Sequence, residues 1–331
     1  MGMKRIGING FGRIGRYFLR MAITNENIDV VAVNDLAPIE TLAHLLKYDS
    51  VHRRFPMDFE IEGDALVFDN GRKVRFTSYH NPTEIPWSDL GVDFVLESTG
   101  IFRTSELASQ HFAGGAKKVI LSAPPQSPDV KTVVFGVNDH LLSTDDKLIS
   151  NASCTTNSAA PMLKVVMELC KIESAFITTV HSYTSDQRLH DAPHSDLRRA
   201  RAAAESIVPT TTGAAKALAK VFPELEGRIG GCGVRVPVPD GSMTDLTLVV
   251  ENPPTEAEIN LAMKNAAEGE LKGILAYTED PLVSVDIIGN SNSCLFDAQL
   301  TSVIGKMVKI VGWYDNEAGY SNRLVDLITR L

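Results

Sequence analysis

The order of apolar and polar residues changes character about halfway along the chain. In the first half, short apolar stretches alternate with helical segments, which predicts an α/β domain with a parallel, doubly wound sheet. Residues 29–34 (Asp-Val-Val-Ala-Val-Asn) are almost continuously apolar, as expected for a strand buried on both faces. Asp69-Asn70-Gly71 separates two apolar stretches and predicts a hairpin. The other strands of this half are expected at 4–9, 65–68, 73–76, 92–96, 118–122, 133–137 and 147–150.

The second half contains more expected strands than crossover segments. Clear helical patterns lie only near 212–221 and 256–267, so we expect an α+β domain whose mostly antiparallel sheet carries its helices on one face. The apolar helical stripe at 324–331 must pack on another part of the protein. The strands of this half are expected at 175–180, 233–238, 245–250, 283–288, 293–300 and 307–313.

Composition and charge narrow the class of protein. The chain has 331 residues, of which 44% are hydrophobic, and this is enough for two cores. A formal net charge of −9 makes nucleic acid and anionic membrane surfaces poor partners. No run of 18 apolar residues occurs, so no membrane-spanning helix is expected. The four cysteines form no Cys-x-x-Cys pair and the histidines lack metal-ligand spacing, which argues against a metal site and favours a reducing compartment.

A glycine-rich turn follows the first expected strand. Gly10-Phe11-Gly12-Arg13-Ile14-Gly15 fits G-x-G-x-x-G, precedes a helical stripe, and is followed 20 residues later by Asp35 at the end of the next strand. The glycines allow a tight turn, a close approach of backbone to a pyrophosphate, and packing of the helix on the sheet. The helix start attracts phosphate, and the carboxylate of Asp35 suits a ribose diol, which favours NAD over NADP. A glycine turn without a ligand is the alternative, which this context disfavours.

A cysteine stands where the last strand of the first half meets a helix. Cys154 begins the helical pattern, and a helix start is expected to lower a thiol pKa, which favours a nucleophile. A buried structural thiol is the alternative for a lone cysteine. His181 ends the strand expected at 175–180, where it suits a general base that also holds Cys154 as thiolate. A strand-end histidine bonded to backbone is the alternative, and only the fold can bring the two side chains together.

Two segments and one strand residue supply groups that bind anions. Thr210-Thr211-Thr212-Gly213 precedes a helix and can either cap it or bind an anion. Arg235 lies in an apolar strand and therefore needs a partner. The arginines of segment 198–201 follow a loop rich in aspartate, which is typical of a solvated surface or a subunit contact and also fits phosphate binding. The interleaved acids disfavour RNA.

Six longer segments together resemble the phosphorylating glyceraldehyde-3-phosphate dehydrogenase family. They match in order over essentially the whole chain. With the patterns above, the resemblance implies a Rossmann NAD-binding domain formed by 1–153 and 316–331, to which the C-terminal helix returns, and a catalytic domain formed by 154–315. The matching segments are 8–16 (Ile-Asn-Gly-Phe-Gly-Arg-Ile-Gly-Arg), 150–157 (Ser-Asn-Ala-Ser-Cys-Thr-Thr-Asn), 181–187 (His-Ser-Tyr-Thr-Ser-Asp-Gln), 197–204, 209–217 and 313–317 (Trp-Tyr-Asp-Asn-Glu).

The resemblance implies that D-glyceraldehyde 3-phosphate is converted to 1,3-bisphosphoglycerate while NAD is reduced. Cys154 would attack the aldehyde, His181 would take its proton, and inorganic phosphate would attack the thioester that remains after hydride transfer. By motif position, the substrate's phosphate is expected at Thr184 and Arg235. The attacking phosphate is expected at Ser153, Thr155, Arg199, Thr212 and Gly213. NAD is expected at Gly10, Gly12, Arg13, Ile14, Gly15, Asp35, Thr99, Ser122 and Asn316.

The resemblance also implies a cytoplasmic homotetramer, in which the loop from residue 182 to about 205 lines a neighbouring subunit's cofactor site. Four positions depart from the usual family pattern. They are Ser158 where a second cysteine is common, Ala318 where Trp is frequent, Asp240-Gly241 where Asn-Val is usual, and Arg53 where Gly is common.

Two alternative functions share this scaffold. Erythrose-4-phosphate dehydrogenase would use the same thiol on a longer sugar phosphate, and Thr184 together with the three threonines at 210–212 disfavours it. A non-catalytic NAD-binding scaffold protein is disfavoured by the intact set of Cys154, His181 and Arg235.

Overall fold

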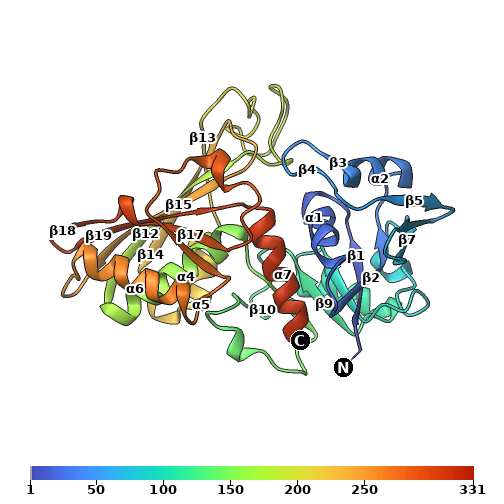
Figure 1. The fold of residues 1–331 in the computed structure, drawn as a ribbon, viewed down its shortest axis with the longest axis horizontal. Helices are drawn as coiled ribbons and strands as arrows, with labels where there is room; N and C mark the ends of the chain where they lie inside the picture. Colours follow the sequence, from blue (N-terminus) through green and yellow to red (C-terminus); the bar gives the residue numbers. More distant parts are fainter. Residues whose placement is uncertain (1) are drawn as a thin grey trace. The chain divides into compact units, whose positions relative to one another are not determined.

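The computed structural model describes residues 2–331 and divides the chain into two compact units (Figure 1). Unit 1 runs to Val133 and also includes Asp139–Ala152 and Ser321–Leu331. Unit 2 consists of Val134–Asn138 and Ser153–Tyr320. The last residues of the chain therefore belong to the same unit as the first.

Unit 1 is built on a nine-stranded sheet in the order β10-β11-β9-β8-β1-β2-β7-β6-β5. The pairs from β10 to β7 are parallel, whereas β7, β6 and β5 pair antiparallel. The parallel sheet predicted from the alternating pattern is confirmed. The strands are β1 (Lys4–Asn9), β2 (Ile28–Asn34), β5 (Phe59–Glu62), β6 (Ala65–Phe68), β7 (Lys73–Thr77), β8 (Phe94–Glu97), β9 (Lys118–Leu121), β10 (Lys131–Thr132) and β11 (Leu148–Ser150), with β3 (Tyr48–Asp49) and β4 (Arg53–Arg54) as a separate pair.

Two local sequence signals in the first half of the chain had different outcomes. The hairpin expected at 69–71 is confirmed, with Gly71 at φ 81° and its N–H donating to Phe68 O at 2.8 Å. The strand expected at 133–137 is wrong, because the strand ends at Thr132. In its place Val134 N donates to the side chain of Asn138 at 2.7 Å, so local turns satisfy the backbone that a sheet would otherwise pair.

The helices of unit 1 cover the parallel sheet through apolar faces. Phe18 and Leu19 of the first helix are fully buried. The final helix is tied to the first strand, because Lys4 Nζ donates to Ile328 O at 2.8 Å and to Thr329 O at 2.7 Å. The helices are α1 (Arg13–Ala22), α2 (Ile39–Lys47), α3 (Ser105–Ser109) and α7 (Ala318–Arg330), with 3-10 turns η1 (Pro82–Glu84), η2 (Gln110–Gly114) and η3 (Asp139–Leu141).

Unit 2 is built on an eight-stranded sheet in the order β13-β14-β12-β15-β19-β17-β16, with β18 also pairing with β19. Only β12 with β14 and β16 with β17 are parallel, so the predicted mostly antiparallel sheet is confirmed. Its strands are β12 (Ile172–Ser182), β13 (Val208–Thr210), β14 (Ile229–Val236), β15 (Ser242–Val250), β16 (Leu275–Thr278), β17 (Cys294–Asp297), β18 (Ser302–Ile304) and β19 (Met307–Tyr314).

Three helices pack on the sheet of unit 2, as the sequence pattern predicts (Figure 1). The helix α4 (Cys154–Leu169) contacts β15, β17 and β19, α5 (Ala214–Val221) contacts β12 and β14, and α6 (Glu256–Glu268) contacts β16. The strand expected at 283–288 is wrong: Ser284–Ile287 form the 3-10 turn η5, and the carboxylate of Asp286 accepts Val283 N at 2.9 Å, which closes the turn. The remaining 3-10 turns are η4 (Pro223–Leu225) and η6 (Ala298–Leu300).

Among residues 2–331, every helix is too short or too polar to cross a membrane.

Candidate active site and cofactor-binding turn

The glycine-rich turn of unit 1 leaves room for backbone and for little else. Gly10 has φ 93°, and a Cβ there would lie 2.7 Å from Thr99 N. A Cβ on Gly15 would lie 2.3 Å from Gly10 O, so both positions exclude any side chain. Around Gly12 no heavy atom lies within 4 Å of where a Cβ would stand. The backbone at Gly12 is therefore open to a ligand at the start of α1, which suits a phosphate group.

The predicted cofactor residues of unit 1 gather at one edge of its sheet. Gly10 follows β1, Asp35 follows β2, Thr99 lies just beyond β8 and Ser122 follows β9. These strands are parallel, so their carboxyl ends meet where a doubly wound fold binds nucleotides. Arg13 and Ile14 begin α1 above the same edge.

Asp35 and Arg13 already have protein partners in the structure. The carboxylate of Asp35 accepts Phe11 N at 2.7 Å and Ala37 N at 3.0 Å. The guanidinium of Arg13 makes two hydrogen bonds to Asp49, at 3.0 and 3.2 Å. Asp35 thus holds the glycine-rich turn in place, a role that the spacing of the motif did not reveal.

Cys154 is the first residue of α4, as predicted from the sequence. Ser153 caps this helix, and its hydroxyl accepts Thr156 N at 3.2 Å. The chain turns from β11 into α4 through Ala152, which has a left-handed φ of 56° although it is not glycine. Such a conformation costs free energy for alanine, on the order of 1 kcal/mol, and the buried surroundings of Ala152 hold it there.

The structure brings His181 to Cys154. His181 lies near the end of β12 and is 6% exposed, with Nε2 3.5 Å from Cys154 Sγ. The edge of its ring meets the ring of Tyr314, with the centroids 5.9 Å apart. The Tyr314 hydroxyl in turn bonds Thr155 Oγ1 at 2.9 Å and Thr179 Oγ1 at 2.8 Å. Tyr314 therefore links the helix of Cys154 to the strand of His181, and sequence reasoning missed it.

Arg235 finds its partner in the same place. It pairs with His181 in the parallel register of β14 and β12, which puts both side chains at one level of the sheet. Its Nη1 lies 2.5 Å from His181 Nδ1 and donates to Ser182 O at 2.8 Å. Arginine has no acceptor atom, so this contact requires a lone pair on Nδ1.

The protonation of the pair differs from the sequence-based expectation. Burial raises the pKa of the Cys154 thiol to about 11, and the opposing effects of Arg235 and of hydrogen bonds from Thr155 do not offset it. Burial and the charge of Arg235 lower the pKa of His181 to about 3. The expected lowering of the thiol pKa by the helix start is therefore wrong, because with these pKa values both groups are neutral near pH 7.

Hydroxyl and cationic groups for anions gather around one carboxylate. Asp186 accepts a hydrogen bond from the Thr184 hydroxyl on one oxygen and from Arg199 on the other. Burial alone would raise the pKa of Asp186, but Thr184 and Arg199 hold it below its usual value. Arg199 Nε also donates to Thr210 Oγ1 at 2.9 Å. Residues predicted to bind two different phosphates, Thr184 and Arg199, thus share a single anionic partner.

The remaining predicted anion site is the start of α5. Thr212 Oγ1 accepts Ala214 N at 3.2 Å, so Thr212 acts as a cap in the structure. A Cβ on Gly213 would meet no heavy atom within 4 Å, which leaves the helix start accessible.

Asn316 presents a defined face of its amide. Its Oδ1 accepts hydrogen bonds from Ser182 Oγ and Ser242 Oγ, both at 2.7 Å. The NH₂ group therefore points the other way and can donate to a carbonyl oxygen of a ligand.

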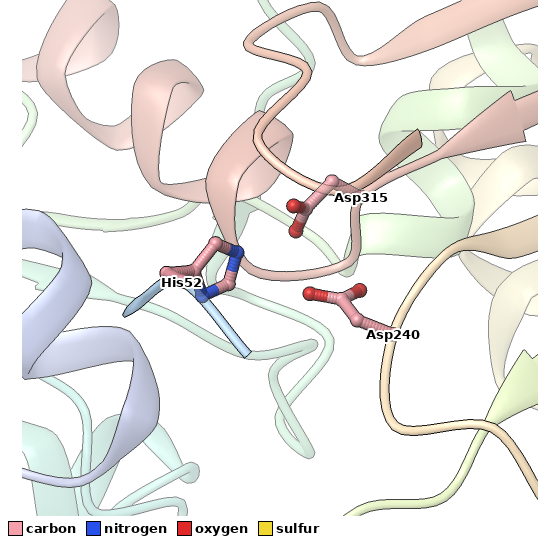
Figure 2. Close-up of side chains that lie close together, drawn as sticks. All are labelled: His52, Asp240 and Asp315. Carbon is pink, nitrogen blue, oxygen red and sulfur yellow. The ribbon is translucent and has the colours of Figure 1, made fainter. Parts of the chain in front are cut away.

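The buried carboxyl groups of Asp240 and Asp315 lie side by side (Figure 2), and Asn316 N donates to Asp240 Oδ1 at 3.2 Å. Asp240 stands between β14 and β15, Asp315 follows β19, and their nearest oxygens are within 4.8 Å. Asp315 accepts N–H groups of Gly289, Glu317 and Ala318 at 2.7 to 2.9 Å. Burial and the charges of Asp315 and Glu317 raise the pKa of Asp240 to about 9. His52, also drawn in Figure 2, belongs to unit 1.

Comparison with known proteins places this geometry among relatives of one activity. The family described as glyceraldehyde 3-phosphate dehydrogenase, NAD binding domain, matches residues 4–105, and its C-terminal domain matches residues 153–316. Glyceraldehyde-3-phosphate dehydrogenase of Geobacillus stearothermophilus is 56% identical over 325 residues, which cover 98% of this chain and 96% of the relative. Glyceraldehyde-3-phosphate dehydrogenase 2 of Streptomyces avermitilis is 55% identical (98% and 97% covered), and the Thermotoga maritima enzyme is 55% identical (99% of both covered).

Proposed function

The chain belongs to the glyceraldehyde-3-phosphate dehydrogenase family and is an NAD-dependent dehydrogenase of that activity, and on this premise we propose that Cys154 is its nucleophile and His181 the base that takes the thiol proton. The observation that carries the proposal is the 3.5 Å separation of Cys154 Sγ and His181 Nε2 at the start of α4. A thiol and an imidazole at this distance can exchange a proton as the sulfur attacks.

The neutral pair defines the first step. The Sγ atom bonds to the aldehyde carbon while its proton passes to Nε2, so Nε2 must be free to accept it. Nδ1 must then carry the other ring proton, and Ser182 O, 2.8 Å away, is its acceptor. A substrate phosphate that draws the Arg235 guanidinium away from Nδ1 favours this tautomer. Binding of the phosphorylated substrate thereby prepares His181 to act as the base.

The later steps use the same residues. NAD, when bound, would supply the hydride acceptor, and once the hydride has left the hemithioacetal carbon a thioester to Cys154 remains. Inorganic phosphate attacks this thioester and the carbon–sulfur bond breaks. The product, 1,3-bisphosphoglycerate, is released, and Cys154 remains as a thiolate. A charge on that sulfur is stabilised by the start of α4 and by protonated His181.

The two phosphates are assigned by motif position, and one residue of each set, Thr184 and Arg199, bonds Asp186 in the structure. Thr184 and Arg235 hold the phosphate of D-glyceraldehyde 3-phosphate, and Ser153, Thr155, Arg199, Thr212 and Gly213 surround the attacking phosphate. The support for this assignment is that Thr184 and Arg199 already bind a carboxylate.

For the cofactor, we assign the phosphates of NAD to the turn at Gly10, Gly12, Arg13, Ile14 and Gly15. Asp35 would accept from a ribose diol, and Thr99 and Ser122 lie along the same sheet edge. The NH₂ group of Asn316 would donate to the carboxamide of the nicotinamide, since two serine hydroxyls orient the amide for that contact. The boundary at Ser153 and the return of Ser321–Leu331 to unit 1 support residues 154–315 as the catalytic domain.

The test is a comparison of purified wild-type protein with Cys154→Ser. Wild-type protein with NAD, inorganic phosphate and D-glyceraldehyde 3-phosphate is expected to form NADH, and Cys154→Ser is expected to bind NAD but form none above background. Equal activity of the two proteins would contradict the mechanism. A kcat/KM for erythrose 4-phosphate well above that for the triose would move the substrate assignment to the tetrose enzyme.

We also infer a cytoplasmic homotetramer. Leu189, Leu197 and Ile207, in and just beyond the loop that follows β12, are 76%, 82% and 67% exposed. Such a group of exposed apolar side chains is typical of a surface that another subunit covers. The four cysteines are free thiols, which fits a reducing compartment. Sedimentation equilibrium is expected to give four times the mass of one chain, and a monomer would contradict the inference.

A further inference from the structure

A buried row of side-chain hydrogen bonds crosses unit 1 at the edge of the sheet where the cofactor residues lie. Trp87 Nε1 donates to His111 Nδ1 at 3.1 Å, and His111 Nε2 lies 2.9 Å from Glu97 Oε2. Asn9 Nδ2 donates to the same oxygen at 2.6 Å. The side chains of Trp87, His111, Glu97 and Asn9 are between 0% and 3% exposed.

The positions of the protons in this row follow from Trp87, whose indole nitrogen can only donate a hydrogen bond. His111 Nδ1 must accept that hydrogen bond. The ring of His111 is therefore neutral and carries its proton on Nε2, which donates to Glu97. A doubly protonated ring would set an N–H against the indole N–H.

Glu97 accepts four hydrogen bonds. Besides His111 and Asn9 on Oε2, Thr99 donates to Oε1 through its backbone N–H at 2.8 Å and its hydroxyl at 2.5 Å. All four donors are neutral, and together they match the acceptor sites of an ionised carboxylate. Hydrogen bonds to a charged acceptor are about twice as strong as neutral ones, so this carboxylate holds its neighbours firmly.

The row continues from Asn9 to Asn34. Because Asn9 Nδ2 donates to Glu97, Asn9 Oδ1 faces the other way and accepts Asn34 Nδ2 at 2.9 Å. Asn34 Oδ1 then accepts Tyr79 N at 2.8 Å. The carboxylate of Glu97 in β8 thereby determines the orientation of the side-chain amides of Asn9 in β1 and Asn34 in β2.

The row touches the predicted cofactor contacts at Glu97 and at Asn34. Thr99 is bound to Glu97, and its backbone packs against Gly10, where a Cβ would stand 2.7 Å from Thr99 N. At the other end, Asn34 O accepts Gly10 N at 2.8 Å, and Asn34 directly precedes Asp35. The glycine-rich turn thus lies between two segments whose positions depend on Glu97.

We propose that Glu97 is a positioning residue of the NAD site, whose carboxylate fixes Thr99 directly and the turn at Gly10 and Asp35 through Asn9 and Asn34. This inference rests on the proposed cofactor contacts of Thr99 and Asp35. Glu97 touches no reacting atom. It holds the backbone and hydroxyl groups that meet the cofactor before NAD arrives, which reduces the ordering that binding requires.

The sharpest variant is Glu97→Gln, which keeps size and shape. Glutamine has one acceptor oxygen and one NH₂ group, and it cannot accept from both sides of the row. If its oxygen faces Asn9 and His111, its NH₂ group opposes Thr99 N–H and pushes Thr99 away. If it is reversed, the NH₂ group opposes Asn9 and His111. Either orientation disturbs one end of the row.

The measurement is the Kd of NAD for the full-length protein, with kcat and KM beside it. In Glu97→Gln, the Kd of NAD is expected to rise about tenfold, which corresponds to the loss of one charge-assisted hydrogen bond. The kcat at saturating NAD and the KM of the triose phosphate are expected to stay within about twofold. The rate of Cys154 alkylation without NAD is expected to be unchanged, which separates this result from a failure of the proposed mechanism.

A matched control comes from unit 2. Asp297 is a buried carboxylate that accepts Trp313 Nε1 at 3.0 Å and Gln299 N at 3.1 Å, so Asp297→Asn makes the same chemical change beside the other tryptophan. It is expected to lower the Tm without changing the Kd of NAD. A Kd for Glu97→Gln within twofold of wild type would overturn the proposal, as would an equal loss of affinity in Asp297→Asn.

Two variants of Thr99 keep the proposal testable if Glu97→Gln does not fold. Thr99→Ser keeps the hydroxyl that donates to Glu97 and is expected to weaken NAD binding less than Thr99→Val does. Thr99→Val loses it and is expected to bind several-fold more weakly. Equal affinities of the two would overturn the proposal. Where Glu97→Gln folds, adding Thr99→Val to it is expected to weaken NAD binding less than in wild type, because the hydrogen bond is already lost.

Discussion

Glu97 in unit 1 and Asp240 in unit 2 are both almost fully buried, at 3% and 1% exposure, but they have opposite surroundings. Four neutral donors face Glu97. Asp240 accepts N–H groups of Gly241 and Asn316, yet its close neighbours include Asp315 and Glu317, and its pKa rises to about 9. Burial alone therefore does not decide whether a carboxyl group is charged, because the donors around it do.

The same contrast holds for the two units as a whole. At the cofactor edge of unit 1, the buried charge is held by a fixed row of amides and ring nitrogens. In unit 2, charged side chains lie around Cys154 and its neighbours, as Arg235 faces the neutral ring of His181 and Arg199 faces the carboxylate of Asp186. In unit 1 the hydrogen-bonding groups are held in fixed positions, whereas in unit 2 the charged side chains can change partners when a ligand binds.

The largest expected effect comes from the charged cluster of unit 2. His181→Asn removes the base at Nε2, and kcat is expected to fall about 10²- to 10³-fold, while the Kd of NAD stays within about twofold. Steady-state kinetics and NAD titration measure the two. The control is Thr244→Val in β15 of the same sheet. It removes a buried hydroxyl that donates to Ser158 at 3.1 Å, and it is expected to keep kcat within about twofold. A His181→Asn enzyme with more than a third of wild-type kcat would contradict the assigned role.

A smaller effect is expected at Asp35, which holds the glycine-rich turn of unit 1. Asp35→Asn keeps an oxygen to accept Phe11 N but removes the charge that repels a 2′-phosphate. The ratio of kcat/KM for NAD to that for NADP is expected to fall about tenfold. The measurement compares the two cofactors at fixed triose phosphate. Asp69→Asn, an exposed change in the hairpin turn, serves as control. An unaltered ratio would remove Asp35 from the specificity of the site.

The smallest effect tests the comparison itself. The folded protein keeps the proton on Asp240 up to about pH 9, whereas an unfolded aspartate loses it near pH 4. Between about pH 4 and about pH 9, the folded state therefore binds more protons than the unfolded state. Asp240 consequently makes folding less favourable as the pH rises through this range. Asp240→Asn removes the dependence and is expected to raise the Tm at pH 8 by a few degrees, corresponding to about 1 kcal/mol. The gain is expected to shrink toward pH 5.

Glu97→Gln, the same acid-to-amide change, is expected to lower the Tm. Thermal melts of both variants at the two pH values provide the check. Shifts of the same sign would show that the two carboxyl groups are alike after all.

Much of the fold was predictable because the relevant signals are local. The buried strand at 29–34, the hairpin at 69–71 and the helix that starts at Cys154 each follow from neighbouring residues. Two expected strands were wrong where side chains of Asn138 and Asp286 close turns within an apolar stretch. Composition could not reveal these bonds, because the same residues also occur beside strands.

The site was predictable in its residue types and not in its contacts. The register of β12 and β14 sets Arg235 beside His181, and no spacing in the sequence encodes the pairing of strands so far apart. The thiol pKa was predicted in the wrong direction, since burial around Cys154 depends on the whole fold. Glu97 was missed because it directly follows the strand expected at 92–96, and its four donors come from Asn9, from His111 and, twice, from Thr99.

The bonds of Thr184 and Arg199 to Asp186 have a consequence for selectivity. The carboxylate of Asp186 already places one negative charge between Thr184 and Arg199. A ligand with a single negative charge, such as a sugar acid, would replace the carboxylate of Asp186 by a group of the same charge and would gain little free energy from the exchange. A phosphate monoester near pH 7 brings close to two charges and three acceptor oxygens, so it outcompetes the resident carboxylate. If Thr184 and Arg199 bind phosphate as proposed, Asp186 would favour a phosphorylated substrate over a monoanion.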